Sequence, residues 1–71
     1  MIKEIQTPFI ILRRKQVEYR TGLSRSTIYA RIATGNFPRP IDLGGGRAVC
    51  WIEAEIDAWV KSRIAESRKD T

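Results

Sequence analysis

The sequence contains no histidine and a single cysteine, Cys50. One thiol cannot form an intramolecular disulfide, and without histidine the chain has too few soft ligands for a tetrahedral zinc site. The same absence excludes a Cys–His nucleophile, because the base that would activate the thiol is missing. We therefore expect no metal, no other cofactor, and a fold stabilised by side-chain packing.

Long apolar runs are also absent. No stretch approaches the roughly 20 residues that a membrane-spanning helix requires, and the N-terminal residues lack the basic start and apolar core of a signal peptide. We expect a cytoplasmic protein without a membrane partner. With 71 residues the chain has room for one domain with a modest core, since a domain of this size buries only about 60% of its unfolded surface. A deep catalytic cavity does not suit such a core, so we expect binding without enzyme activity and no small-molecule ligand.

Positive charge is concentrated in one part of the chain. Thirteen Lys and Arg against eight Asp and Glu give a formal net charge of +5. Residues 13–33 contain six of the basic residues and one acidic residue, Glu18, so this segment alone accounts for the net charge. Such a local excess is the electrostatic footprint of a phosphate-binding surface. The alternative is that these side chains only solvate a helical face.

The pattern of residues in this basic segment predicts two helices. Residues 13–21 contain no Gly or Pro and are rich in helix formers, and Gly22 suits the left-handed position that ends a helix. Ser24 is expected to cap a second helix from Arg25 to about residue 33. In that helix Ile28 and Ile32 lie one turn apart and face the core.

The rest of the domain is expected to contain short strands and a third helix. Residues 9–12 suit a strand, residues 36–40 a loop, and residues 41–43 and 48–51 a β-hairpin around the glycines at 44–46, in which residues 41 and 43 share one face. Apolar residues recur at helical spacing from Glu53 to about residue 66. Glu53, Glu55 and Asp57 suit the helix dipole there and do not converge on a metal. The predicted core residues are Val17, Leu23, Ile28, Ile32, Ile56, Trp59 and Val60.

These elements together predict a mainly α fold with a small β-hairpin wing: three helices plus short antiparallel strands. Residues 9–66 form the expected domain. A flexible arm at residues 1–8 precedes it, and a frayed tail at residues 67–71 follows it.

Residues 21–29 join a helix end, a glycine turn, a cap and a second helix, which is the signature of a helix-turn-helix. A short turn holds the second helix against the first and leaves its N-terminal half free to enter a DNA major groove, about 12 Å wide. Arginine can donate two hydrogen bonds to guanine, and an alanine methyl can contact thymine. The base-reading candidates are Arg25, Ser26, Thr27, Ala30 and Arg31. The same geometry also occurs in packing units that do not bind DNA.

A second set of residues is expected to contact the DNA backbone. In a helix-turn-helix the start of the first helix crosses the sugar-phosphate backbone, and Arg47 stands beside the glycine-rich tip of the hairpin. The backbone candidates are Arg13, Arg14, Lys15, Ser24, Tyr29 and Arg47. Such contacts position the protein and do not specify sequence. Three alternatives stay open: Tyr29 in the core, Arg25 on a phosphate, and Arg47 in solvent.

Four blocks of the sequence, in order, resemble the AlpA family of phage-type regulators: LRRKQV at 12–17, TGLSRSTIY at 21–29, GNFPRP at 35–40 and WIEAEIDAW at 51–59. The resemblance covers about residues 11–64. It implies a winged helix-turn-helix of the MerR-like or excisionase-like kind, with a recognition helix at residues 24–33 and a wing tip at residues 44–47. Asp42 and Cys50 depart from the pattern of the wing strands. Phe37, Trp51 and Trp59 match its aromatic positions, and we expect them to pack in the core.

The resemblance also implies a function. It indicates a bacterial, sequence-specific regulator of transcription that binds double-stranded DNA in a prophage or mobile-element setting and is nucleoid-associated when bound. One role is promoter activation, with RNA polymerase as a protein partner. The alternative is an excisionase that binds and bends DNA beside an integrase or another recombinase. A second alternative, from a different class, is an inhibitor that docks on another regulator.

Overall fold

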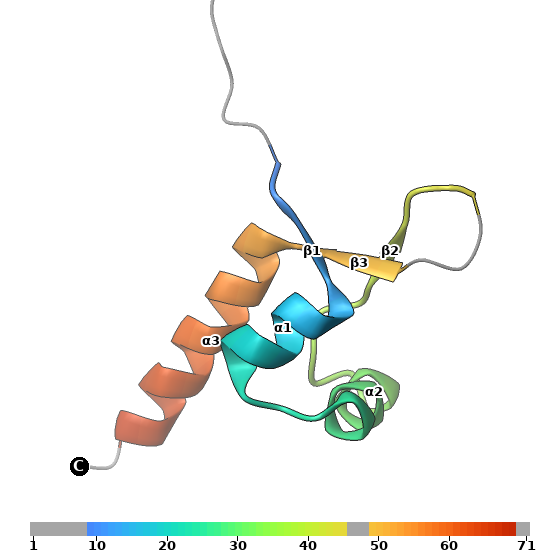
Figure 1. Ribbon diagram of the computed structural model, residues 1–71. Coiled ribbons are helices and arrows are strands. Elements are labelled where there is room, and N and C mark those ends of the chain that lie inside the picture. The colour runs from blue at the N-terminus through green and yellow to red at the C-terminus, as the bar shows by residue number, and fades with distance from the viewer. Residues whose placement is uncertain (1–8, 46–48, 70–71) are drawn as a thin grey trace, which may run out of the picture.

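The computed structural model describes residues 9–45 and 49–69. The described elements are β1 (Ile11–Arg13), α1 (Arg14–Thr21), α2 (Arg25–Ala33), β2 (Ile41–Asp42), β3 (Val49–Ile52) and α3 (Glu53–Arg68). α1 and α2 pack beside a small sheet, and α3 runs along the other side of α1 (Figure 1). The predicted fold, three helices with a small β wing, is confirmed. The predicted N-terminal arm and Arg47 lie outside the described residues.

The three strands form one antiparallel sheet in the order β1-β3-β2. Leu12 of β1 pairs with Trp51 of β3, and Ile41 of β2 pairs with Cys50 on the other side. The first strand therefore lies two residues later at its start than the predicted strand at residues 9–12. Phe9 is 78% exposed. The apolar run therefore begins before the residues that pack against the rest of the domain.

The first wing strand is shorter than predicted. Asp42 Oδ1 accepts a hydrogen bond of 2.8 Å from the N–H of Gly44, and Gly44 has a φ of 90°. This side-chain turn ends β2 at Asp42. Leu43 consequently leaves the sheet and is 65% exposed, and the prediction that it shares a face with Ile41 was wrong.

The core is a single cluster between the sheet and the three helices. Its buried members are Leu12, Val17, Ile28, Phe37, Trp51 and Ile56. The predicted core residues Leu23, Ile32, Trp59 and Val60 pack against this cluster but are only partly buried. Cys50, which was not predicted to be in the core, is buried at the centre of the sheet.

Two helix ends differ from the predicted ones. α1 begins at Arg14, because Arg13 is extended and pairs with Cys50 as the last residue of β1. α3 continues to Arg68, two residues beyond the predicted end, and the Nζ of Lys69 lies 3.7 Å from Glu66 Oε2. Cations at a helix C-terminus are stabilised by the helix dipole. No helix in the described part of the chain is long and apolar enough to cross a membrane.

Candidate nucleic-acid interface

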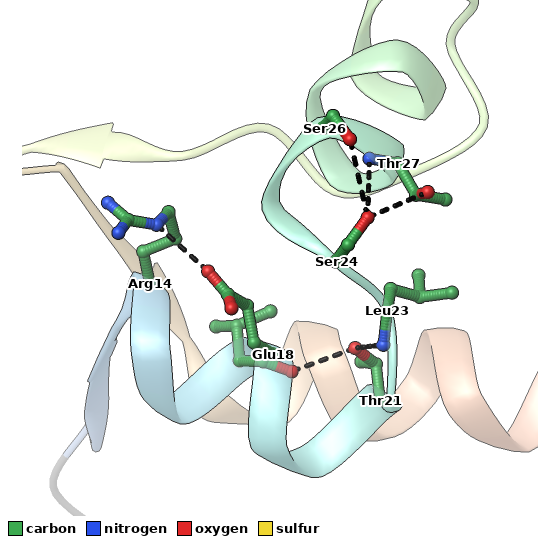
Figure 2. Close-up of polar contacts among 8 residues, drawn as sticks. Arg14, Glu18, Thr21, Leu23, Ser24, Ser26 and Thr27 are labelled. Carbon is green, nitrogen blue, oxygen red and sulfur yellow. Dashed lines mark hydrogen bonds and ion pairs between the residues drawn. The ribbon is translucent and has the colours of Figure 1, made fainter.

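The turn between α1 and α2 consists of three residues, and each has a defined role. Gly22 has a φ of 75°, and its N–H donates to Glu18 O at 2.8 Å. The hydroxyl of Thr21 donates to Val17 O at 2.8 Å and accepts from the N–H of Leu23 at 3.2 Å (Figure 2). These contacts fix the direction in which the chain leaves α1 and bring Leu23 against the core.

Ser24 caps α2, as predicted from the sequence. Its Oγ accepts from the N–H of Thr27 at 3.2 Å and donates to Thr27 Oγ1 at 3.0 Å, with Ser26 Oγ 3.4 Å away (Figure 2). A capping oxygen satisfies one of the N–H groups that a helix start leaves without an internal partner. The Ser24 hydroxyl is therefore used mainly within the protein.

The outward face of α2 is small and polar. Ile28 is fully buried, and Ser26 and Ala30 on the opposite side are exposed, with Thr27 half-buried between them. α2 contains two arginines and no carboxylate. Its surface therefore presents hydroxyls, one methyl group and positive charge, without a group that would repel phosphate.

The two arginines of α2 point to different neighbours. The Cζ of Arg25 lies 5.9 Å from the centre of the Tyr29 ring, which in turn meets Trp51 edge-on at 6.5 Å. The Cζ of Arg31 lies 5.7 Å from the centre of the Trp59 ring, on α3. A guanidinium within about 6 Å of an aromatic face is attracted to it. Arg25 is thus held near the sheet, and Arg31 is held near α3.

The sequence is compatible with two positions of Tyr29, one in the core and one in contact with the DNA backbone. The side chain is 37% exposed. Its ring meets the buried Trp51 edge-on and lies near the guanidinium of Arg25. Tyr29 therefore connects an exposed arginine to the core.

The start of α1 brings together three basic side chains. The Nε of Arg14 lies 3.0 Å from Glu18 Oε2, and its two terminal nitrogens are directed away from that carboxylate (Figure 2). Arg13 and Lys15 are exposed, and neither forms an ion pair with any residue that the structure describes. The positive charge here is thus only partly neutralised.

Arg20 belongs to the same basic segment but has another role. Its Nη1 lies 2.7 Å from Glu53 Oε2 and 3.7 Å from Asp57 Oδ1, so it joins the end of α1 to the first turns of α3. From the sequence, Glu53 and Asp57 are expected to suit the helix dipole, with no partner on another helix. Their spacing of four residues could have indicated a shared partner, but nothing in the sequence identified that partner as Arg20.

Two indoles hold the segment that follows α2. Trp51 Nε1 donates to Pro38 O at 2.9 Å, and Trp59 Nε1 donates to Asn36 O at 2.9 Å. The ring of Phe37 is buried and meets the Trp59 ring edge-on at 4.7 Å. These contacts agree with the expected packing role of the three aromatic residues, and they fix the C-terminal end of α2.

The predicted site residues that the structure describes lie on one side of the molecule. The start of α1 and the first turns of α2 are on the side away from α3 (Figure 1). Arg31 is the member closest to α3. The arrangement is a basic surface centred on a capped helix, which suits an extended, negatively charged partner.

Comparison with known proteins identifies the family. Residues 10–64 match the model of the prophage CP4-57 regulatory protein (AlpA) family. The chain is 45% identical over 58 residues to the uncharacterized protein ORF88 of Enterobacteria phage P4, covering 82% of this chain and 65% of that protein. It is 41% identical over 59 residues to the DNA-binding transcriptional activator AlpA of Escherichia coli (strain K12), covering 75% of this chain and 83% of that one. No solved structure matches the chain. The chain therefore belongs to the AlpA family of prophage regulatory proteins.

Proposed function

We propose that this protein regulates transcription by binding a specific sequence of double-stranded DNA, with α2 in the major groove. The observation that supports this most directly is the outward face of α2, which combines arginine, small polar side chains and no carboxylate on a helix fixed by a three-residue turn. The E. coli relative is, by its name, a DNA-binding transcriptional activator. A protein that acts by occupying a site needs no catalytic group.

Within this proposal the residues of α2 make different contacts with the DNA. Arg25 reads a guanine, Ser26 and Thr27 contact base edges or phosphates, and Ala30 contacts a thymine methyl. Because Arg31 lies over Trp59, we expect it to contribute less to base reading than Arg25.

The backbone contacts come from the start of α1 and from the wing. Arg13 and Lys15 are exposed there, and the terminal nitrogens of Arg14 face away from Glu18. Arg47, which the sequence places at the wing tip, supplies a contact to the flanking backbone. Such contacts fix the register of the protein on the duplex.

Affinity measured against salt tests this proposal. Fluorescence anisotropy would use two labelled duplexes, one from the DNA that flanks the protein's own gene and one of random sequence. Arg25→Ala should cost about 1–3 kcal/mol on the specific duplex and much less on the random one. Lys15→Ala should weaken both duplexes alike and lower the salt slope by about one. Lys61→Ala, a change of an exposed lysine on α3, is the matched control and should change neither. Absence of salt-dependent binding to any duplex would contradict the proposal and favour an inhibitor of another regulator.

The bend in the bound duplex distinguishes a promoter activator from an excisionase. A promoter activator would bind beside RNA polymerase at one site, whereas an excisionase would bind adjacent sites, bend the duplex and meet an integrase. We propose the activator role, in keeping with the name of the E. coli relative. A gel assay with the site placed at different positions along a fragment measures the bend, and a strong bend with several adjacent footprints would favour the excisionase role.

A further inference from the structure

A groove lies along the C-terminal half of α3, and Arg31 is the described lining residue that it shares with the proposed DNA surface. The groove has a volume of about 430 Å³ and is bounded by the ends of α1 and α2 and by one strip of α3. α1 ends at Thr21 beside the middle of α3, so the last turns of α3 extend past the rest of the domain (Figure 1). The strip of α3 that packs on the core at Ile56 continues here without a helix against it.

The groove combines an apolar floor with a cationic rim. Trp59, Val60 and Ile64 supply the floor, and Ile64 is 46% exposed. The rim consists of Arg20, Arg31, Arg63 and Arg68. The described residues that line the groove include no carboxylate. Of the four arginines, Arg20 is joined to Glu53 and Arg31 lies over Trp59, whereas Arg63 forms no ion pair with a described residue.

This composition determines which kind of occupant fits. A second copy of the chain docked groove to groove would place arginines opposite arginines, because the described lining has one sign of charge. Duplex DNA would satisfy the arginines but would leave Val60 and Ile64 against sugars and phosphates, with no apolar surface to cover. A peptide helix that presents both carboxylates and apolar side chains satisfies the rim and the floor together.

We propose that this groove, between the ends of α1 and α2 and the C-terminal half of α3, is the docking site for an acidic, amphipathic segment of a partner protein. Arg31 belongs to both surfaces, and the other described residues that line the groove are not among the proposed DNA contacts, so substitutions at Arg63 and Ile64 test the groove separately. The groove gives a DNA-bound domain of this size a second surface through which it contacts another protein.

The test uses the full chain and two synthetic, fluorescein-labelled peptides of about four helical turns. One peptide presents leucine and glutamate on a single face, and the other has the same charge with serine in place of leucine. The wild-type protein should bind the first peptide more tightly than the second, with affinity that falls as salt rises. Arg63→Glu and Ile64→Ser should each weaken binding about five- to tenfold, because each removes one of the two required contacts. Lys61→Glu makes the same change of charge on the same helix outside the groove, and it should have little effect.

Several results would overturn the proposal. Equal affinity for the two peptides, or equal loss from Lys61→Glu and Arg63→Glu, would mean that only the net charge of the protein is sensed. A loss of duplex DNA affinity in Arg63→Glu clearly larger than that in the charge-matched Lys61→Glu would assign the groove to DNA. A wild-type dimer in sedimentation velocity that Ile64→Ser dissociates would assign it to a second copy. Circular dichroism of each variant checks that it is folded, and both groove positions are exposed.

Discussion

Gly22 ends α1 and begins the turn that positions α2. Its replacement gives a quantitative test of the turn. With a φ of 75° and a ψ of 6° this residue is in the left-handed region. A Cβ added there would meet nothing within 4 Å. Replacement by alanine therefore introduces no clash, and its effect comes from the backbone conformation alone.

The expected loss follows from that single cause. Holding an L-residue with a Cβ in the left-handed region costs about 1–2 kcal/mol, and a smaller gain arises because alanine restricts the unfolded chain. A net loss of about 1 kcal/mol is a substantial part of the roughly 4–10 kcal/mol expected for 71 residues. In a domain of this size it lowers Tm by about 4–8 °C. Gly22→Asn should lose less, because asparagine tolerates the left-handed region better.

Thermal unfolding followed by circular dichroism measures both variants under one set of conditions. The expected order of Tm is wild type, then Gly22→Asn, then Gly22→Ala. A Gly22→Ala protein with the wild-type Tm, or a Gly22→Asn protein less stable than Gly22→Ala, would refute the assignment of Gly22 as a left-handed helix end.

Other changes test the cap, the core, the indole contact and the ion pair. Ser24→Ala should cost about 1 kcal/mol in urea unfolding, since the N–H of Thr27 loses its acceptor, and Ser24→Asp should retain most of the stability; equal losses would contradict the cap. Ile28→Ala should cost about 2–5 kcal/mol, because the side chain is fully buried, and a loss below about 1 kcal/mol would contradict its place in the core. Trp59→Phe removes the donor to Asn36 O and should cost about 0.5–1.5 kcal/mol, with faster amide exchange in residues 34–37; unchanged exchange would count against a stabilising role of this hydrogen bond. Arg20→Gln should cost less than about 1 kcal/mol, because Arg20 is more than a third exposed, and high salt should reduce the difference; a loss that salt leaves unchanged would contradict an electrostatic origin.

The helix-turn-helix could be predicted closely because its determinants are local. The turn and α2 have the bounds predicted from Gly22, Ser24 and the spacing of Ile28 and Ile32. Each of these determinants acts within a few positions along the chain. The end of β2 was missed for a related reason. A single hydrogen bond from the N–H of Gly44 to Asp42 decides it, and an aspartate two positions before a glycine is compatible with both a strand and a turn.

The pairing of charges and aromatics could not be predicted, because it depends on contacts between distant segments. Arg20 was counted with the basic segment, yet the fold brings it to Glu53. Arg31 and Trp59 are 28 positions apart in the sequence, and their contact places one predicted base-reading residue next to α3. The groove along α3 also arises only when the ends of three helices meet.

The central claim, that α2 lies in the major groove, is tested most directly by dimethyl sulfate protection on a bound duplex. The reagent methylates guanine N7 in the major groove and adenine N3 in the minor groove. We predict protection of at least one guanine N7 within the site, and we predict that this protection is lost in Arg25→Ala while Lys15→Ala retains it at saturating protein. A saturated complex in which every guanine N7 stays reactive, or in which only adenine N3 is protected, would contradict the assignment of α2 as the recognition helix.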